Sequence, residues 1–291
     1  MTTSEERKIN GVAGSAPREA SRADQLLSSE LPAVARAHIR LARKTFEPGM
    51  VDRGLRIAQK WVGASWIDAC TRNLRRIHGF DRVGAFDPAK SYVCVANHRS
   101  FFDLYVVTAY LVKHGLLPHR LLFPVRSTFF YESAAGMVVN GAMSFFAMYP
   151  PLFRERRLAH LNVASLDEIG RLLSGPGVFV GLHPEGTRGK DDDPYALLPA
   201  RSGVGRIIHQ SGATVIPVFI NGLGNGLAKQ VAGNFTGKGE PINVVFGAPV
   251  DFGDLRDRPA SPRVFKQVSE SSLEAVRRLG EEERALRANA T

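Results

Sequence analysis

The sequence predicts an α/β fold in which a largely parallel central sheet is flanked by helices. Short apolar runs rich in β-branched residues recur along the chain, and segments with helical periodicity separate them. The runs at 92–96, 178–182, 213–220 and 242–246 are expected to be buried strands. An N-terminal amphipathic helical extension is expected to precede this sheet.

Length and composition are those of a globular protein with an unusual charge. The chain has 291 residues, of which 44% are hydrophobic and 23% are charged, so it can bury a large core. Its net charge of +10 favours an anionic partner, such as a nucleic acid, a phosphorylated metabolite or an acidic lipid surface. Cys70 and Cys94 lie far apart without metal-ligand spacing, which fits a reducing compartment and predicts no zinc site.

The N-terminal part of the chain divides into a tail and a helical extension. Residues 1–30 are polar and lack an apolar signal region, so they are predicted to be a disordered tail. Residues 31–79 are predicted to be a helical, membrane-associating extension, because apolar and basic residues alternate at helical spacing over 48–78 and both tryptophans, Trp61 and Trp66, lie there. Amphipathicity alone equally fits a helix that packs on the core.

Residues 133–153 contain no charged residue and are long enough to be weighed as a transmembrane span. Gly136, Asn140 and the pair Pro150 and Pro151 interrupt the segment, and much of it is alanine or glycine. We therefore expect a buried helix, or a helix that lines an apolar channel.

The first motif with chemical content is NHRSFFD at 97–103. It follows a predicted strand and precedes an apolar helix over 104–112, so His98 is expected at a strand-to-helix corner and Asp103 in the first helical turn. This corner would let the two side chains meet as a base and its partner. The alternative is a capping box, in which Ser100 and Asp103 only satisfy N–H groups at the helix start.

A second motif, HPEGTR at 183–188, follows the strand predicted at 178–182. Its proline and glycine indicate a sharp turn at the strand end, and Arg188 is a fixed cation suited to a phosphate group. Helices are predicted before this strand at 161–173 and after LLPARSG at 197–203, and Ser261 and Pro262 are predicted to open a final helix.

These blocks together resemble the glycerolipid acyltransferases. NHRSFFD, HPEGTR, LLPARSG and ATVIPV at 213–218 occur in the family's order and near its spacing, and the resemblance covers about residues 80–250. The sequence looks like the lysophosphatidic acid acyltransferase branch. The resemblance identifies residues 80–291 as the expected acyltransferase domain.

The resemblance also implies roles for individual residues. His98 would be the general base for an acceptor hydroxyl, and Asp103 would orient its imidazole. The resulting alkoxide would attack the acyl thioester directly, since the chain has no G-x-S-x-G elbow for a serine nucleophile. The block Glu185, Gly186, Thr187 and Arg188 would bind the acceptor, with Arg188 on its phosphate and Glu185 organising the site or contacting the glycerol.

Three features depart from the family pattern. Arg201 stands where the family commonly has lysine, so a place near phosphate is a less secure implication. His183 replaces the usual phenylalanine, where packing would be a sufficient role. The arginine of the family's second block has no assigned counterpart, and four arginines compete for it: Arg126, Arg154, Arg156 and Arg157.

The expected reaction is transfer of a fatty acyl group from acyl-CoA or acyl carrier protein to lysophosphatidic acid, giving phosphatidic acid. Alternative acceptors are glycerol 3-phosphate, another lysophospholipid or a glycolipid, and the alternative to an enzyme is a non-catalytic lipid-binding relative. No cofactor, metal or nucleic acid is expected, since the chain lacks a zinc-finger or RNP-type motif. The expected location is peripheral, on an anionic surface at the cytoplasmic face of the cell membrane. Oligomeric state is not predicted.

Overall fold

The computed structural model of the chain describes residues 22–224 and 226–289. Its longer helices are α1 (Ala33–Lys44), α2 (Met50–Ala58), α3 (Ala64–Thr71), α4 (Asp103–Lys113), α6 (Ala134–Ser144), α7 (Leu161–Leu173), α8 (Ser202–Ser211), α9 (Leu227–Thr236) and α10 (Pro262–Ala288). Shorter helical segments are η1 (Arg22–Leu27), η2 (Gln59–Gly63), η3 (Phe80–Arg82), α5 (Ser127–Phe130), η4 (Arg156–Leu158) and η5 (Gly253–Arg256).

The central sheet is mostly parallel, as the sequence predicts. Its strands are β1 (Arg75–His78), β2 (Tyr92–Ala96), β3 (Arg120–Leu122), β6 (Val178–Leu182), β7 (Thr214–Asn221) and β8 (Ile242–Phe246), in the order β1-β8-β7-β2-β6-β3. Only the β7–β8 pair is antiparallel within this sheet. The short strands β4 (Val125–Arg126) and β5 (Pro151–Leu152) form a separate parallel pair.

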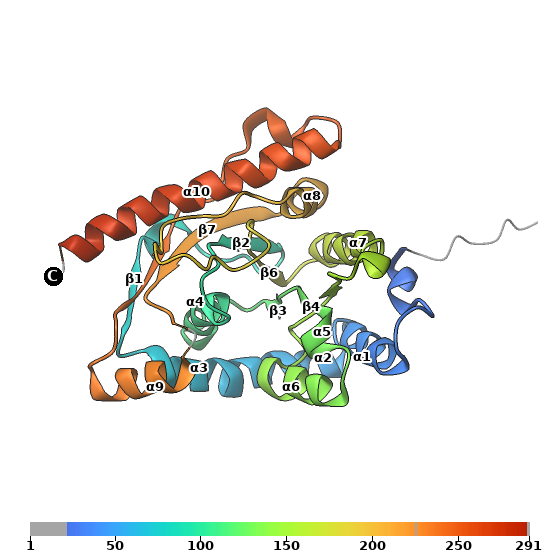
Figure 1. Cartoon of the computed structure of the whole chain (residues 1–291), viewed down its shortest axis with the longest axis horizontal. Coiled ribbons are helices and arrows are strands. Elements are labelled where there is room, and N and C mark those ends of the chain that lie inside the picture. The colour runs from blue at the N-terminus through green and yellow to red at the C-terminus, as the bar shows by residue number, and fades with distance from the viewer. Residues whose placement is uncertain (1–21, 225, 290–291) are drawn as a thin grey trace, which may run out of the picture.

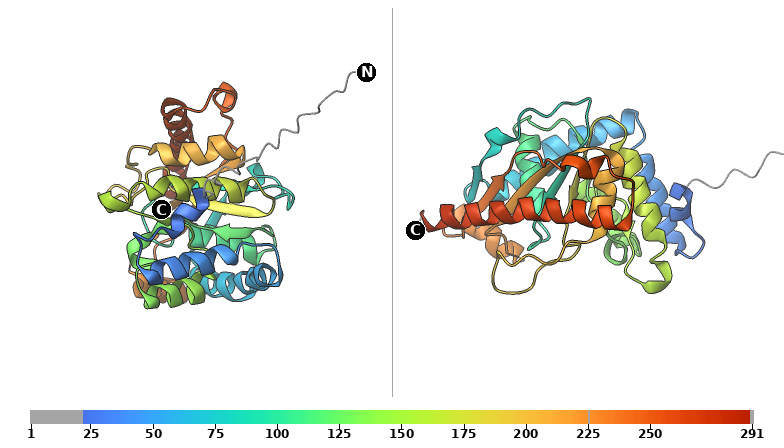
Figure 2. Two further views of the ribbon diagram at one scale, coloured as in Figure 1. Left: turned by 90° about the vertical axis from the view of Figure 1, so that its right-hand side faces the viewer. Right: turned by 90° about the horizontal axis from the view of Figure 1, so that it is seen from above.

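Helices cover both faces of the sheet (Figure 1). On one face, α7, α8 and α10 bury an apolar cluster that includes Val93 and Val215. On the other face, α4 and α3 bury a second cluster that includes Cys94 and Ile216. Consecutive residues of one strand point to opposite faces, so β2 and β7 supply both cores, which explains their continuous apolar runs. Figure 2 shows α10 crossing the sheet on the side away from α1, α2 and α6.

The segment predicted as one amphipathic helix over 48–78 is divided in the structure. α2 passes through the wider turns of η2 into α3, and the chain then leaves the helix and forms β1, which pairs with β8. The helix predicted at 75–78 is therefore wrong, because pairing with a strand more than 160 residues away decides this segment. The sheet thus begins inside the predicted helical extension.

The N-terminal tail predicted over 1–30 lies partly outside the described residues. Within the described part, η1 packs on α7 and Leu26 is buried. The tail stays a prediction for residues 1–21. The division of the remaining chain at residue 79 also stays a prediction.

Residues 133–153 form α6, a turn in which Phe145 and Phe146 adopt positive φ, and β5. One side of α6 buries Gly136, Asn140 and Ser144, while Val138 and Met143 are exposed on the other. α6 is therefore half-buried. Across the part of the chain that the structure describes, every helix is too short or too polar to cross a membrane.

Candidate functional site

Three neighbouring strands deliver the candidate site residues to one edge of the sheet. β2 lies between β6 and β7 and runs parallel to both, so their carboxyl ends meet. His98 follows β2, and the second motif follows β6 directly. The Asn97 amide fixes the end of β2 because it donates to the Ile220 carbonyl and accepts from the Ile220 N–H, each at 2.8 Å.

His98 meets Asp103 at the corner between β2 and α4. The distance from His98 Nδ1 to Asp103 Oδ2 is 3.3 Å, slightly longer than a typical hydrogen bond. Asp103 is the first residue of α4 and is fully buried, whereas part of the His98 ring remains accessible. This arrangement leaves Nε2 of His98 for another partner.

Asp103 also serves the backbone of the corner. Its Oδ2 accepts the N–H groups of Arg99 and Ser100, each at 2.8 Å, as a capping residue does. The two interpretations of this spacing are thus not alternatives. One carboxylate oxygen fixes the loop that carries His98 and contacts the His98 ring.

Glu185 connects the two motifs through the backbone. One carboxylate oxygen accepts the His98 N–H at 2.8 Å and the other accepts the Leu198 N–H at 2.7 Å. The side chain is 1% exposed. Of the two roles implied for Glu185, this geometry fits organisation of the site, since both oxygens already bind N–H groups.

His183 lies directly against His98. Their ring centroids are 3.8 Å apart and the rings are 9° from parallel. His183 Nδ1 lies 3.0 Å from the Ala96 carbonyl oxygen, which only accepts hydrogen bonds. The proton of neutral His183 therefore resides on Nδ1. The sequence drew attention to His183 only as a departure from the family pattern.

The remaining residues of the second motif surround its turn. Gly186 has φ +67°, and a Cβ there would lie 3.1 Å from Cγ of Arg201, so the position favours glycine. Arg201 is exposed and its N–H donates to the Pro184 carbonyl at 2.8 Å. Thr187 lies half-buried in the same turn. Arg201 thus supports the turn with its backbone and its side-chain stem.

Of the four arginines considered for the second block, Arg154 contacts the turn of the second motif. Its guanidinium lies 3.4 Å from the Gly186 carbonyl oxygen. Its positive charge adds to burial in lowering the pKa of His98. Burial, and then the charge of Arg126, lower the pKa of Arg154 itself. Arg157 instead pairs with Glu155. The charge of Arg188 likewise adds to burial in lowering the pKa of His98. Sequence spacing could not select Arg154, because β5 and the turn after β6 approach only in the folded chain.

Burial sets the protonation of the pair. Burial, reinforced by the nearby Arg188 charge, lowers the pKa of His98 to about 4. Burial raises the pKa of Asp103 to about 6, although neighbouring positive charge and N–H donors stabilise the carboxylate and act to lower this pKa. At pH 7 the imidazole is thus neutral and the carboxylate is ionised. The site therefore offers an unprotonated base.

Backbone donors near the motifs are largely committed. The N–H groups of His98, Arg99 and Ser100 bind carboxylates, as described above. Those of Gly186 and Gly189 donate to the carbonyls of His183 and His98. These five groups are consequently not oxyanion donors in this conformation.

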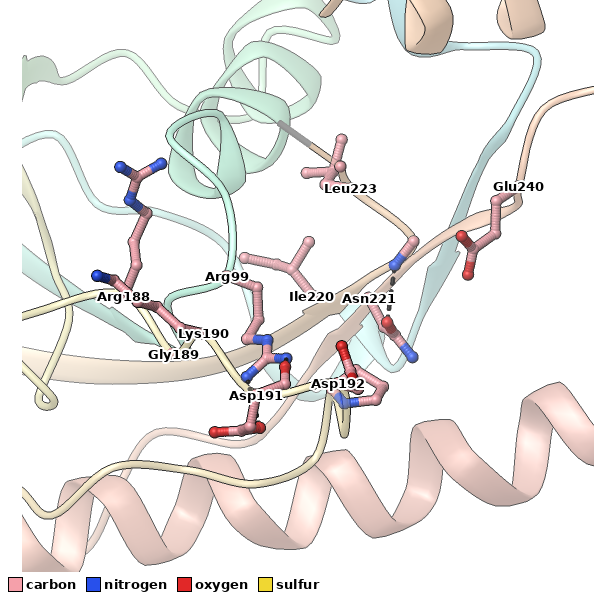
Figure 3. A pocket seen from close by; sticks show the side chains of 13 residues that line it. Arg99, Arg188, Gly189, Lys190, Asp191, Asp192, Ile220, Asn221, Leu223 and Glu240 are labelled. Atoms are coloured by element: carbon pink, nitrogen blue, oxygen red, sulfur yellow. Dashed lines mark hydrogen bonds and ion pairs between the residues drawn. The ribbon is translucent and has the colours of Figure 1, made fainter. Parts of the chain in front are cut away.

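A polar cavity of about 670 Å³ opens beside the motifs (Figure 3). Basic and acidic side chains both line it, including Arg99, Arg188, Lys190, Asp191 and Glu240. Figure 3 shows Arg99 reaching Asp191, and these side chains form an ion pair at 3.2 Å. The sequence did not indicate this cavity, because residues from three strand ends and the loop after Gly189 form it together.

Among the described residues, His98, Asp103 and His183 are the one group of three potential metal ligands, with donor atoms within 4.8 Å of one another. The lone pairs of two nearly parallel rings lie in two separate planes and do not meet at one ion. The arrangement therefore does not fit a metal ion. The absence of a metal and of a cofactor stays a prediction.

Comparisons with known proteins indicate the family of the chain. A family model described as Acyltransferase matches residues 73–221, more than half of the chain. The fold is similar to the crystal structure of PlsC, the 1-acyl-sn-glycerophosphate (LPA) acyltransferase from Thermotoga maritima, at 14% identity and a TM-score of 0.47. The match covers 86% of this chain and 95% of that chain. No curated protein matches the sequence significantly.

Proposed function

Because this chain belongs to the acyltransferase family, we propose that it transfers a fatty acyl group from acyl-CoA or acyl carrier protein to the free hydroxyl of lysophosphatidic acid, giving phosphatidic acid. The observation that carries the proposal is a neutral His98, paired with buried Asp103, beside the cations Arg188 and Arg154. A base and a phosphate-binding charge are the two features that this reaction requires of one site.

His98 Nε2 takes the proton of the acceptor hydroxyl as the hydroxyl oxygen attacks the thioester carbonyl. Asp103 balances the imidazolium that forms, which an ionised carboxylate can do at neutral pH. The tetrahedral intermediate then expels the thiolate, and the imidazolium returns the proton to its sulfur. No covalent acyl-enzyme and no resident cofactor take part in this sequence.

Arg188 and Arg154 would hold the acceptor phosphate. They come from the turn after β6 and the loop after β5, and the charges of both lower the pKa of His98 after burial, so both cations lie on the side of the site that carries the base. Guanidinium groups suit phosphate because they present paired N–H donors. Glu185 would contribute by holding the His98 backbone.

An apolar crevice next to the polar cavity supports a lipid substrate. Trp66, Phe102 and Val106 line the crevice, and Leu223 and Gly224 belong to both spaces. The crevice has a volume of about 20 Å³, room for about one water molecule, so we propose that its side chains move apart when part of an acyl chain enters, while the charged groups of the substrate remain in the cavity.

We also propose that the protein works peripherally at the cytoplasmic face of the cell membrane. The helices α2, α6 and α9 and the turn η2 lie along one side of the molecule (Figure 1), and each carries exposed apolar side chains. Examples are Met50 at 83% exposure, Trp61 at 65% and Phe235 at 65%. Trp66 instead is half-buried against the core. Basic residues beside this surface would add a salt-sensitive attraction to acidic lipid.

Flotation with vesicles that contain an anionic phospholipid tests this location. Trp61→Ser should weaken flotation at high salt, where the apolar contribution dominates. Val163→Ser on α7 is the control, because Val163 is also exposed but lies outside this surface. Equal flotation of both variants and the unaltered chain would contradict membrane contact through η2.

A panel of acceptors tests the reaction. Purified protein receives one labelled acyl-CoA or acyl carrier protein and, in turn, lysophosphatidic acid, glycerol 3-phosphate, another lysophospholipid and a glycolipid. We expect transfer to lysophosphatidic acid, lowered by about 10²- to 10⁴-fold in His98→Ala. Preference for another acceptor would replace the proposed substrate, and absence of transfer with every pair would favour a lipid-binding role.

A further inference from the structure

His183 gives the base a second contact besides Asp103. The single contact from His98 Nδ1 to Asp103 is 3.3 Å long and fixes one edge of the imidazole, but leaves the ring able to rotate about its side-chain bonds. The parallel face of His183, 3.8 Å away, opposes such rotation. His183 is itself held through Nδ1 by the Ala96 carbonyl at the end of β2.

Building on the proposed function, we infer that His183 is a positioning residue for His98, whose ring face fixes the plane of the base and keeps water from one side of it. The inference concerns the aromatic face, not a proton transfer by His183. Burial lowers the pKa of His183 to about 3, so this ring is neutral at any pH at which the site would operate.

The geometry distinguishes this role from ordinary packing. A side chain that only fills space can be replaced by another shape of similar volume. A catalytic base needs its reacting nitrogen within a narrow range of positions, which requires support for the ring plane. Asp103 supports the edge and His183 supports the face, so together they define the direction of Nε2.

Several charged groups lie around the His98 and His183 rings and must remain in place when His183 is altered. They come from α4, from the turn after β6, from the loop after β5 and from the corner itself: Asp103, Glu185, Arg188, Arg154 and Arg99. The Nδ1 proton of His183 goes to the Ala96 carbonyl, not to any of these groups. Substitutions of His183 therefore change the ring contact with limited effect on these charges.

Two variants separate the features of His183. His183→Phe keeps an aromatic face but removes the N–H that donates to Ala96. His183→Asn keeps a donor near the position of Nδ1 but removes the face. His119→Phe is the matched control. His119 is a buried histidine that also bonds to backbone carbonyls, those of Asp87 and Lys90, but it precedes β3 at the amino ends of the strands, away from the motifs.

The experiment measures kcat and KM for donor and acceptor, the pH dependence of kcat/KM, and the His98 imidazole pKa by NMR of histidine-labelled protein. His183→Asn should lower kcat by about 2- to 10-fold, the usual range for one aromatic contact, with KM little changed. Water reaching the exposed face should raise the His98 pKa toward about 6.5, so the acidic limb of kcat/KM moves to higher pH. His183→Phe and His119→Phe should leave both quantities near those of the unaltered protein.

A purely structural His183 would lower the melting temperature without moving the His98 pKa or the acidic limb, and this result overturns the inference. A loss in His183→Phe as large as that in His183→Asn also overturns it, because the face is then not the determinant. If His183→Asn does not fold, His183→Leu is the second variant without an aromatic face. The NMR measurement requires no turnover, so it tests the inference even if no acceptor is converted and the proposed function fails.

Discussion

Replacing Glu185 by glutamine should both destabilise the protein and slow it. The carboxylate accepts N–H groups of His98 and Leu198 at 2.8 and 2.7 Å in a fully buried position. Glutamine keeps one acceptor and turns an NH₂ group toward the other N–H. A hydrogen bond to a charged group contributes about 1.5–3 kcal/mol. Burial raises the pKa of Glu185, so glutamine relieves part of the cost of a buried charge. A net loss of about 2 kcal/mol is expected.

This loss corresponds to a fall in melting temperature of about 4–8 °C for a domain of this size. Thermal and urea unfolding measure it, and steady-state kinetics with both substrates varied measure kcat and each KM. We expect a lower kcat, because the His98 backbone loses its support, with a smaller change in acceptor KM. Glu168→Gln is the control. Glu168 lies on α7, away from the motifs, and is equally buried, but its carboxylate binds Tyr149 and Arg171. It should lower stability and leave the kinetics unchanged.

The opposite pattern would refute this reasoning. If Glu185 contacts the glycerol of the acceptor, Glu185→Gln should raise acceptor KM while the melting temperature stays constant. That outcome would mean that the two backbone hydrogen bonds contribute little and that the carboxylate turns toward the substrate when it binds.

Three further substitutions test the site. His98→Ala should lower turnover by about 10²- to 10⁴-fold with little effect on folding, and near-normal turnover at saturating substrates would exclude His98 as the base. Asp103→Asn should lower turnover and melting temperature together, because one oxygen contacts His98 and accepts two N–H groups; a normal melting temperature would show that capping is dispensable. Arg188→Ala should raise KM for a phosphorylated acceptor far more than for the donor, with partial recovery in Arg188→Lys. Equal effects on a phosphate-free acceptor would contradict a phosphate contact.

The sequence by itself determined four strands of the sheet, β2, β6, β7 and β8, and the edge of the sheet at which the candidate site lies. The apolar runs that became β2, β6, β7 and β8 are strong local signals, because strands buried on both faces need apolar side chains at every position. The motifs begin where two of these runs end, and parallel neighbouring strands bring such ends together. The corner that joins His98 to Asp103 follows from spacing, since Asp103 lies only five positions after His98.

The tertiary structure decided what each motif residue contacts. Glu185 binds the His98 N–H across 87 residues of sequence, and His183 stacks on the same histidine at a similar separation. β1 is a strand because β8 offers a partner, although its own residues continue a helical pattern. Local periodicity reports which face of an element is buried. It carries no information on which distant side chain or backbone group will lie against that face, because this depends on how the strands order themselves in the sheet.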